Sequence, residues 1–189
     1  MPFEHELKNA YIGEVYEYSY DFRNKTWATC QTDGRTVTWG NTPSVWSSGI
    51  YYNGWYSNVV KTLDKDFSNA NKITFSMYYY APSNFDGLWL RILKMPWDSN
   101  RCWTWISTTD RQVSINNTTV QSVTKSKPST WWYTQTIEYD LVNKTYSYSG
   151  EFSATWSLTD AQITIIRTLN TLWLGLDYSY VWTVSIKIE

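Results

Sequence analysis

The sequence predicts an all-β protein: an antiparallel two-sheet β-sandwich of the jelly-roll type, with little or no helix. Apolar and polar residues alternate with period two along most of the chain, whereas apolar residues at helical spacing are scarce. Turn signals rich in Asn, Asp and Gly separate the alternating stretches. At least ten strands fit this pattern, and that many antiparallel strands are expected to pack as two sheets.

Alternation is clearest in residues 15–20, 73–80, 131–139 and 180–188. Each of these stretches predicts a half-buried strand, because successive side chains of a strand point to opposite faces of the sheet. Large residues from each stretch are assigned to the inner faces, among them Tyr16, Tyr18, Phe75, Tyr133 and Trp182.

Further elements follow from local composition. Residues 88–93 are apolar on both faces apart from Arg91, which indicates a central strand covered on both sides or a strand that borders a groove. Residues 157–160 could cap a short helical turn, but residues 163–166 are β-branched at all four positions, so they predict a strand after a turn. Hairpins are expected at residues 20–27 and 139–146, which share a Tyr-Asp-x-x-Asn-Lys-Thr pattern, and around Asn116-Asn117.

The order of these stretches resembles the concanavalin A-like lectin and glucanase jelly rolls, particularly their laminin G-like branch. The resemblance is carried by Ile73–Tyr80, by Trp131–Thr145 and by Leu172-Trp-Leu-Gly175 before a long last strand. It covers roughly residues 35–189, and it implies a lectin-like domain over that range. Residues 1–34 are expected to form an N-terminal segment with a hairpin, either an assembly contact or an added strand pair.

Charge and cysteine content exclude several classes of partner. With 16 Lys and Arg against 17 Asp and Glu, the formal net charge is -1, so neither nucleic acid nor a membrane surface is an expected partner. The opening residues have no basic segment followed by an apolar run, so no signal peptide is predicted, and synthesis in the cytoplasm is expected. Cys30 and Cys102 are expected to be buried free thiols rather than a disulfide.

Catalytic chemistry is not strongly indicated. Glycoside hydrolysis needs two carboxyl groups about 5 to 10 Å apart, and the clustered Glu-x-Asp-x-x-Glu of laminarinase-like relatives is absent. Glu138 and Glu151 flank the second predicted hairpin and are the minority catalytic candidates, although solvated outer-face carboxylates need no function. His5 is the one histidine, so a nucleophilic triad and a zinc site with the two cysteines are not expected. No cofactor is predicted; calcium remains an alternative at Asp64, Asp66 and Asp86, which turn formation explains equally well.

The aromatic content is the strongest functional signal. Aromatic residues make up 19% of the chain, with 13 Trp and 16 Tyr, which exceeds what one core of this size is expected to bury. A Trp or Tyr ring can stack on the C–H face of a sugar while neighbouring polar groups bind its hydroxyls. Three clusters offer that combination. They are Tyr51, Tyr52, Trp55 and Tyr56; Trp97, Asp98, Asn100, Arg101, Trp103 and Trp105, which is favoured; and Tyr78 and Tyr80 beside Arg91.

The sequence therefore predicts a non-enzymatic lectin-like binding or adhesion module that recognises a glycan or a partner protein. The absence of a predicted signal peptide would suit a bacteriophage virion or tail component. Two alternatives stay open. The first is a purely structural virion decoration or fibre domain, in which the exposed aromatics are buried against other copies of the chain or against a virion neighbour. The second is a jelly-roll glycoside hydrolase.

Overall fold

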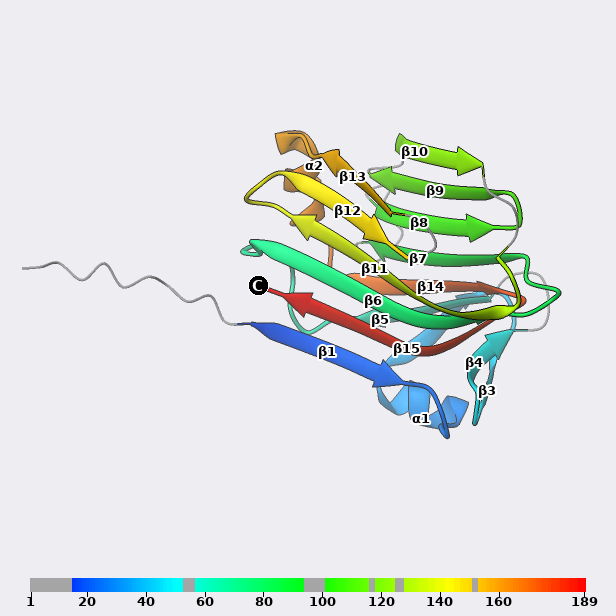
Figure 1. Ribbon diagram of the computed structural model, residues 1–189. Coiled ribbons are helices and arrows are strands. Elements are labelled where there is room, and N and C mark those ends of the chain that lie inside the picture. The colour runs from blue at the N-terminus through cyan, green and yellow to red at the C-terminus, as the bar shows by residue number, and fades with distance from the viewer. Residues whose placement is uncertain (1–14, 53–56, 94–100, 116–117, 125–127, 151–152) are drawn as a thin grey trace, which may run out of the picture.

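The chain is a sandwich of two antiparallel sheets with two short helices (Figure 1). The computed structural model describes residues 15–52, 57–93, 101–115, 118–124, 128–150 and 153–189. Within these residues it contains fifteen strands and two helices, so the predicted all-β sandwich is confirmed.

The first sheet, sheet A, has eight strands in the order β13-β12-β11-β6-β15-β4-β3, with β1 also paired to β15. Its strands are β1 (Tyr16–Asp21), β3 (Ser44–Trp46), β4 (Gly49–Tyr52), β6 (Lys72–Ala81), β11 (Trp131–Asp140), β12 (Thr145–Ser149), β13 (Ser153–Ser157) and β15 (Ser179–Ile188). The strands β6 and β15 pair over most of their length at the centre of this sheet.

The second sheet, sheet B, has seven strands in the order β10-β9-β8-β7-β14-β5-β2. Its strands are β2 (Arg35–Trp39), β5 (Ser57–Thr62), β7 (Gly87–Leu93), β8 (Arg101–Ser107), β9 (Asp110–Ile115), β10 (Thr118–Thr124) and β14 (Thr171–Asp177). Residues 88–93 thus lie in a strand with partners on both sides, as their composition predicts.

The core lies between the two sheets and is built by strict alternation. In β6 the odd-numbered residues Ile73 to Tyr79 are buried while the even-numbered residues are half-exposed, and β11 repeats the pattern at Ile137 and Tyr139. Sheet B contributes Leu88, Leu90 and other apolar residues to the same cluster. Burying such side chains is worth about 1.5 to 3 kcal/mol each, so this alternation is the main source of stability.

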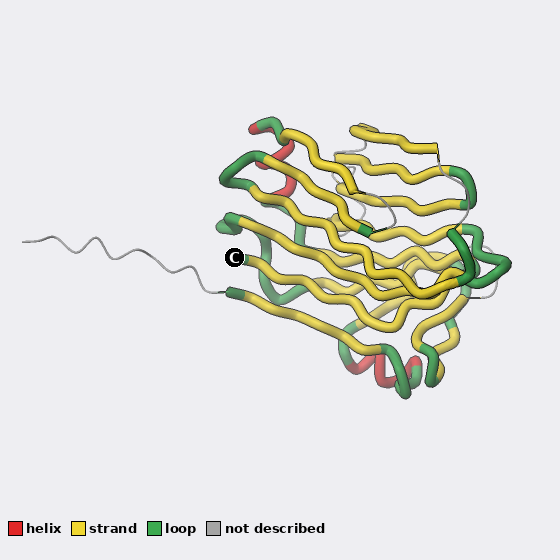
Figure 2. Tube along the Cα trace, viewed as in Figure 1, coloured by secondary structure: helices red, strands yellow, loops and turns green. Residues whose placement is uncertain are grey.

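Both helices lie at the margins of the sandwich (Figure 2). Helix α1 (Trp27–Thr32) begins after Thr26, whose side chain accepts a hydrogen bond from the Thr29 amide, and it buries Cys30 against the core. Helix α2 (Asp160–Ile166) joins a strand of sheet A to a strand of sheet B and buries Ile163 and Ile166. Neither helix is long enough to span a membrane, and the described part of the chain holds no other helix.

Two local predictions are wrong. Residues 163–166, where a strand is predicted, lie instead in helix α2. A capping box starts this helix, because Thr159 and Gln162 exchange hydrogen bonds between side chain and backbone. The predicted hairpin at residues 20–27 is instead the end of β1 followed by α1. The second predicted hairpin, at 139–146, does join two paired strands, β11 and β12.

The N-terminal part of the chain packs directly on the sandwich through a buried arginine. Strand β1 pairs with β15, and its Tyr18 accepts a hydrogen bond of 2.7 Å from the guanidinium of Arg35. The Arg35 side chain is fully buried, forms an ion pair with Asp33 at 3.2 Å, and lies 4.6 Å from the ring of Tyr20. Burial raises the pKa of Tyr18 above its ordinary range. This network joins β1 of sheet A to β2 of sheet B.

Both cysteines are buried and do not form a disulfide, as predicted. Cys30 accepts a long hydrogen bond of 3.6 Å from the hydroxyl of Tyr20, and burial raises the pKa of its thiol. A buried neutral thiol of this kind acts as a small apolar side chain rather than as a nucleophile.

Candidate functional site

The outer face of sheet B carries a row of residues in which two tryptophans are flanked by amides. Strand register places Asn58, Gly175, Trp89, Trp105 and Gln112 side by side, on β5, β14, β7, β8 and β9 in turn. These residues face away from the core, because their neighbours along each strand belong to the core cluster. We call these five residues the central row.

The two tryptophans of the central row stack on each other. The ring centroids of Trp89 and Trp105 lie 4.7 Å apart with an angle of 14° between the planes, and both side chains are half-buried. Offset parallel stacking of this kind is a favoured geometry for aromatic pairs and is worth about 0.5 to 1.5 kcal/mol beyond area burial. The pair therefore forms a defined apolar surface rather than two independently mobile rings.

A glycine on the neighbouring strand makes room for this pair. A Cβ atom added at Gly175 would lie 3.0 Å from the Cβ of Trp89 and 3.1 Å from its Cδ1. Trp89 therefore lies over the backbone of β14, and any larger residue at position 175 would displace the ring. A second buried aromatic, Trp173, lies further along β14 with Val60 beside it and Trp89 packed against both.

Polar atoms on the same face lack partners within the described part of the chain. The Asn58 side chain is 3% exposed and its Oδ1 atom accepts no hydrogen bond. Ser114, which follows the central row on β9, is fully buried and its Oγ atom has no hydrogen-bond partner. Buried polar groups normally find partners, so unpaired ones beside an aromatic surface indicate a place for ligand or water hydrogen bonds.

The favoured sequence cluster is in part assembled on this face. Trp105 is one of the two half-buried tryptophans of the central row, whereas Trp97, Asp98 and Asn100 lie outside the described residues. The pairing of β7 with β8 places Trp103 opposite Arg91 and Arg101 opposite Leu93. Trp89, Trp173 and the two flanking amides are not among the site residues predicted from the sequence, although Trp89 alternates with Leu88 and Leu90.

The third predicted cluster is wrong as a unit. Tyr78 and Tyr80 lie on β6 in sheet A, whereas Arg91 lies on β7 in sheet B, so the two tyrosines and the arginine belong to different sheets. Alternation within each strand shows which residues share a face, but it does not show which sheet the strand joins.

Tyr78 and Tyr80 instead join a cluster of half-buried rings on the outer face of sheet A. Tyr78 and Trp132 stack at 5.2 Å, Trp132 and Trp182 lie 3.9 Å apart, and Tyr80 lies 4.9 Å from Trp132. At the margin, Tyr51 stacks on Tyr180 at 3.9 Å and 11°, and Tyr180 also contacts Tyr80. We call this set the ring cluster; it comprises Tyr51, Tyr78, Tyr80, Trp132, Tyr180 and Trp182.

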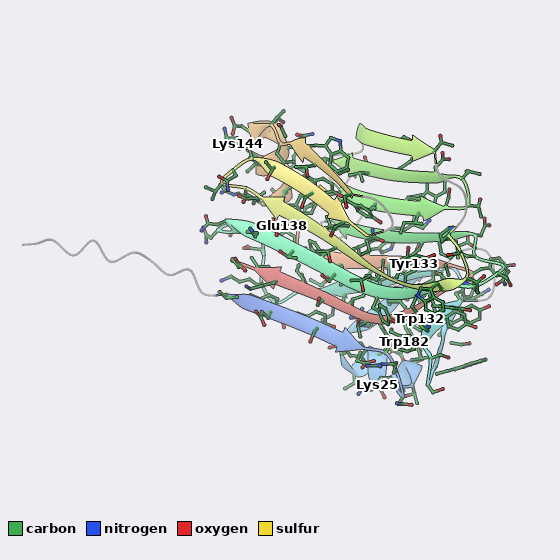
Figure 3. All side chains as sticks on the ribbon, in the orientation of Figure 1. Lys25, Trp132, Tyr133, Glu138, Lys144 and Trp182 are labelled. Atoms are coloured by element: carbon green, nitrogen blue, oxygen red, sulfur yellow. The ribbon has the colours of Figure 1, made fainter. Side chains whose placement is uncertain are left out.

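A β-bulge brings Trp182 into the ring cluster, and the assignment of Trp182 to the inner face is therefore wrong. The register between β15 and β6 shifts between Val181 and Thr183, where Val181 pairs with Tyr79 and Thr183 with Tyr78. The extra residue reverses the alternation, so that Val181, Val184 and Ile186 are buried while Trp182 is half-exposed. Figure 3 shows Trp132 and Trp182 together toward one end of the sheet, with Glu138 toward the other end.

The predicted cluster at residues 51–56 is also not found as one unit. Tyr51 belongs to the ring cluster, but Tyr52 packs against the core and its hydroxyl accepts a hydrogen bond of 2.9 Å from the Asn41 amide. Tyr52 is therefore a structural residue. Trp55 and Tyr56 lie outside the described residues.

The candidate catalytic and calcium residues do not form a site in the described part of the chain. Glu138 lies on the outer face of sheet A, paired with Lys72 at 3.3 Å, while Glu151 lies outside the described residues. Asp64, Asp66 and Asp86 are exposed, and Asp66 accepts hydrogen bonds of 3.1 and 2.6 Å from the backbone and hydroxyl of Ser68. These bonds lower the pKa of Asp66. Among the described residues, no three acidic, histidine or cysteine side chains gather where a metal ion could bind.

Comparison with solved structures shows the fold. The winged bean acidic lectin complexed with methyl-α-D-galactose superposes with a TM-score of 0.68 at 10% identity, covering 93% of this chain and 99% of the lectin. The CBM2 module of the evolved Dit of Lactobacillus casei BL23 phage J-1 gives 0.68 at 8% identity, covering 93% and 96%. The Crh5 transglycosylase in complex with NAG gives 0.57 at 18% identity, covering 92% and 83%.

No family model and no curated protein sequence matches the chain. The structural likeness therefore rests on backbone geometry at low sequence identity, and it extends over nearly the whole chain. It confirms the predicted lectin and glucanase type of jelly roll, whereas the laminin G-like branch is not specifically shown.

Proposed function

We propose, from the concanavalin A-like fold of this chain, that it is a non-enzymatic lectin-like module that binds glycan on the outer face of sheet B. The central row carries this proposal: two stacked tryptophans lie between the amides of Asn58 and Gln112 on one rigid sheet. A sugar ring presents C–H groups on its faces and hydroxyl groups at its edge, so it needs this combination of surfaces.

The proposed site lies on strands rather than on loops, so its shape is already formed before a ligand binds. Trp105 and Trp89 are held by direct register and by ring stacking, so little conformational entropy is lost when a ligand binds. The formal net charge of -1 gives no long-range attraction for phosphate, which favours an uncharged ligand over a nucleic acid.

Binding without turnover is supported by the residue types on this face. Glycoside hydrolysis requires two carboxyl groups about 5 to 10 Å apart across the bond that is cleaved. The central row contains none, and the minority candidate Glu138 lies on the other sheet in an ion pair with Lys72.

A role in a bacteriophage virion or tail, as an adhesion component, is part of the proposal. It is supported by the likeness to the carbohydrate-binding module of a phage Dit protein over nearly the full length of both chains. The rival is a purely structural decoration or fibre domain that self-assembles through aromatics. Light scattering separates the two, since the rival requires a concentration-dependent oligomer and no response to sugar.

The test is a glycan array with the intact chain, followed by titration of the best-bound glycan into Trp105→Ala and Trp131→Ala. Trp131 is 67% exposed and makes no ring contact with another described residue, so it is the matched control. We expect Trp105→Ala to weaken binding about tenfold or more, which corresponds to about 1.4 kcal/mol, and Trp131→Ala to leave it within twofold. Equal affinity of the parent chain and Trp105→Ala would contradict the proposed site.

A further inference from the structure

A second surface on the opposite side of the sandwich also combines aromatic rings with hydroxyl groups. The ring cluster occupies one end of β6 and β15 on the outer face of sheet A, and its rings form a continuous series of contacts from Tyr51 to Trp182. The guanidinium of Arg23 lies 4.8 Å from the ring of Trp182, at the margin of the cluster.

The ring cluster runs directly into a polar groove along the same strands. The groove has a volume of about 510 Å³. Its outward-facing lining consists of four hydroxyl side chains and one ion of each sign: Ser19, Thr74, Ser76, Ser185, Glu17 and Lys187. On β6 the next outward residue after Ser76 is Tyr78, and Ser185 pairs with Ser76 across to β15. Groove and ring cluster are therefore contiguous.

The length of this surface suits a chain of several sugar units rather than one. Thr74 and Tyr80 are six residues apart on one strand, which corresponds to about 20 Å at roughly 3.3 Å per residue. The rings lie at one end and the hydroxyls at the other, so a ligand extending along β6 meets both.

The charges of the surface favour a neutral ligand. The groove lining has one acid, Glu17, and one base, Lys187, and the latter also forms an ion pair with Glu189. Lys72 is likewise paired with Glu138. With its cations in ion pairs, the surface has no excess positive charge for an acidic polysaccharide.

We propose that the ring cluster and the groove together form a second binding surface, for a linear neutral oligosaccharide lying along β6 and β15. It lies on the opposite sheet from the central row and goes beyond the proposed function, because it is a separate site with its own ligand geometry. A protein partner is the less favoured occupant, because the cores of protein interfaces are depleted in serine, whereas three serines line this groove.

The test uses the full chain carrying Trp105→Ala, so that the site on sheet B is removed. The probes are neutral cello-, xylo- and manno-oligosaccharides of two to six units, titrated by calorimetry. We expect residual binding of at least one series to strengthen with chain length up to six units. Adding Trp132→Ala is expected to weaken hexasaccharide binding at least fivefold, and Ser185→Gln, which fills the groove, is expected to weaken it by a similar factor.

Two matched changes serve as controls, each outside the ring cluster and the groove. Trp131→Ala removes an exposed tryptophan from the same strand as Trp132, and Thr155→Gln enlarges an exposed side chain on β13 of the same sheet. Both are expected to leave affinity within twofold. Circular dichroism checks that each variant is folded.

Each outcome decides between the two sites. The second surface is overturned, while the proposed function stands, in either of two cases. In the first, Trp105→Ala abolishes binding of every probe. In the second, Trp132→Ala and Ser185→Gln leave the affinity of the residual binding unchanged. If Trp132→Ala abolishes binding and Trp105→Ala does not, the second surface stands and the proposed site on sheet B fails. Self-association that Trp132→Ala abolishes, with no sugar response, would overturn the proposal in favour of a protein interface.

Discussion

The two outer faces of the sandwich both carry aromatic residues, but they bury them differently. On β14 of sheet B, the outward residues Thr171 and Trp173 are 0% and 3% exposed, although neither belongs to the core between the sheets. On β6 of sheet A, the outward residues Ser76 and Tyr78 are half-exposed. On sheet B, Trp89 packs over Trp173 and Val60 and helps to cover β14 from outside, whereas on sheet A the hydroxyls and rings of β6 are half-exposed.

This difference indicates two kinds of recognition surface. A covered face with unpaired polar atoms, such as Oδ1 of Asn58, is suited to enclosing part of a ligand. An open strip of rings and hydroxyls is suited to a longer ligand that stays accessible along one side. On each face a glycine lies close to a tryptophan: Gly175 contacts Trp89, and Gly49 contacts Trp182. Substituting these glycines tests the difference between the two faces.

The largest effect is expected for Gly49→Ala in sheet A. Gly49 has a φ of +99°, and an added Cβ would lie 2.3 Å from the carbonyl oxygen of Val181 and 3.0 Å from Cδ1 of Trp182. We expect a loss of about 3 kcal/mol in the free energy of unfolding, from backbone strain and steric clash together. Urea denaturation measures it.

Gly34→Ala is the matched control for this change. Gly34 also has a positive φ, of +81°, but its added Cβ would meet only the flexible end of Lys61. It should cost about 1 to 2 kcal/mol from backbone strain alone. Equal costs for the two variants would show that the bulge at Trp182 does not depend on close packing against Gly49.

A smaller effect, of about 1 to 2 kcal/mol, is expected for Gly175→Ala in sheet B, because the added Cβ would lie no closer than 3.0 Å to Trp89, so this residue must shift by only a few tenths of an ångström. The change should nevertheless disturb the Trp89–Trp105 stack, which near-ultraviolet circular dichroism detects. Thr155→Ala, at an exposed position on sheet A, should leave that signal unchanged. An unaltered signal in Gly175→Ala would mean that the glycine does not position the pair.

A pH-dependent effect is expected at the turn between β11 and β12 of sheet A, where Asp140 closes the hairpin. Its carboxylate accepts hydrogen bonds of 2.8 Å from both the backbone and the side-chain amide of Asn143, and these lower its pKa from 3.8. The stabilisation is present above pH 3.8 and is lost as the pH falls through the lowered value.

Asp140→Asn should therefore lower the free energy of unfolding by no more than about 1 kcal/mol at pH 7. The difference from the parent chain should shrink as the pH falls below 4. A difference that stays constant between pH 7 and pH 2 would contradict the role of the carboxylate.

The smallest effect is expected for Glu138→Gln. Both members of the ion pair with Lys72 are about one third exposed, so its loss should change the free energy of unfolding by less than about 1 kcal/mol, with the effect decreasing at high salt. We also expect neither the parent chain nor the variant to cleave β-glucan or xylan. Release of reducing ends from β-glucan or xylan by the parent chain, but not by Glu138→Gln, would support the glycosidase alternative.

Alternation of residue types was sufficient to predict the sandwich and most inner faces. Ile73, Phe75 and Tyr79 are buried as the pattern requires, because burial on one face of a strand is decided by neighbours two residues apart. The hairpin turn after Asp140 could also be predicted from neighbouring residues, since the backbone amide of Asn143 donates a hydrogen bond to the Asp140 carboxylate. Such features depend on few residues and can be read from the chain.

Two features depended on contacts between distant residues, and a third depended on a local contact that opposed the residue propensities. The bulge that turns Trp182 outward is defined by the pairing of β15 with β6. Arg91 was grouped with Tyr78 although the two strands enter different sheets. In helix α2 the capping box of Thr159 and Gln162 outweighs the β-branched residues that follow, from which the sequence predicts a strand.

The most direct test of the proposed function is a crystal structure of the chain with a glycan selected on the array. We predict electron density for a sugar ring against Trp105 on the outer face of sheet B, with hydroxyls hydrogen-bonded to Asn58 or Gln112. A glycan bound at full occupancy elsewhere, with the face around Trp105 empty, would contradict it.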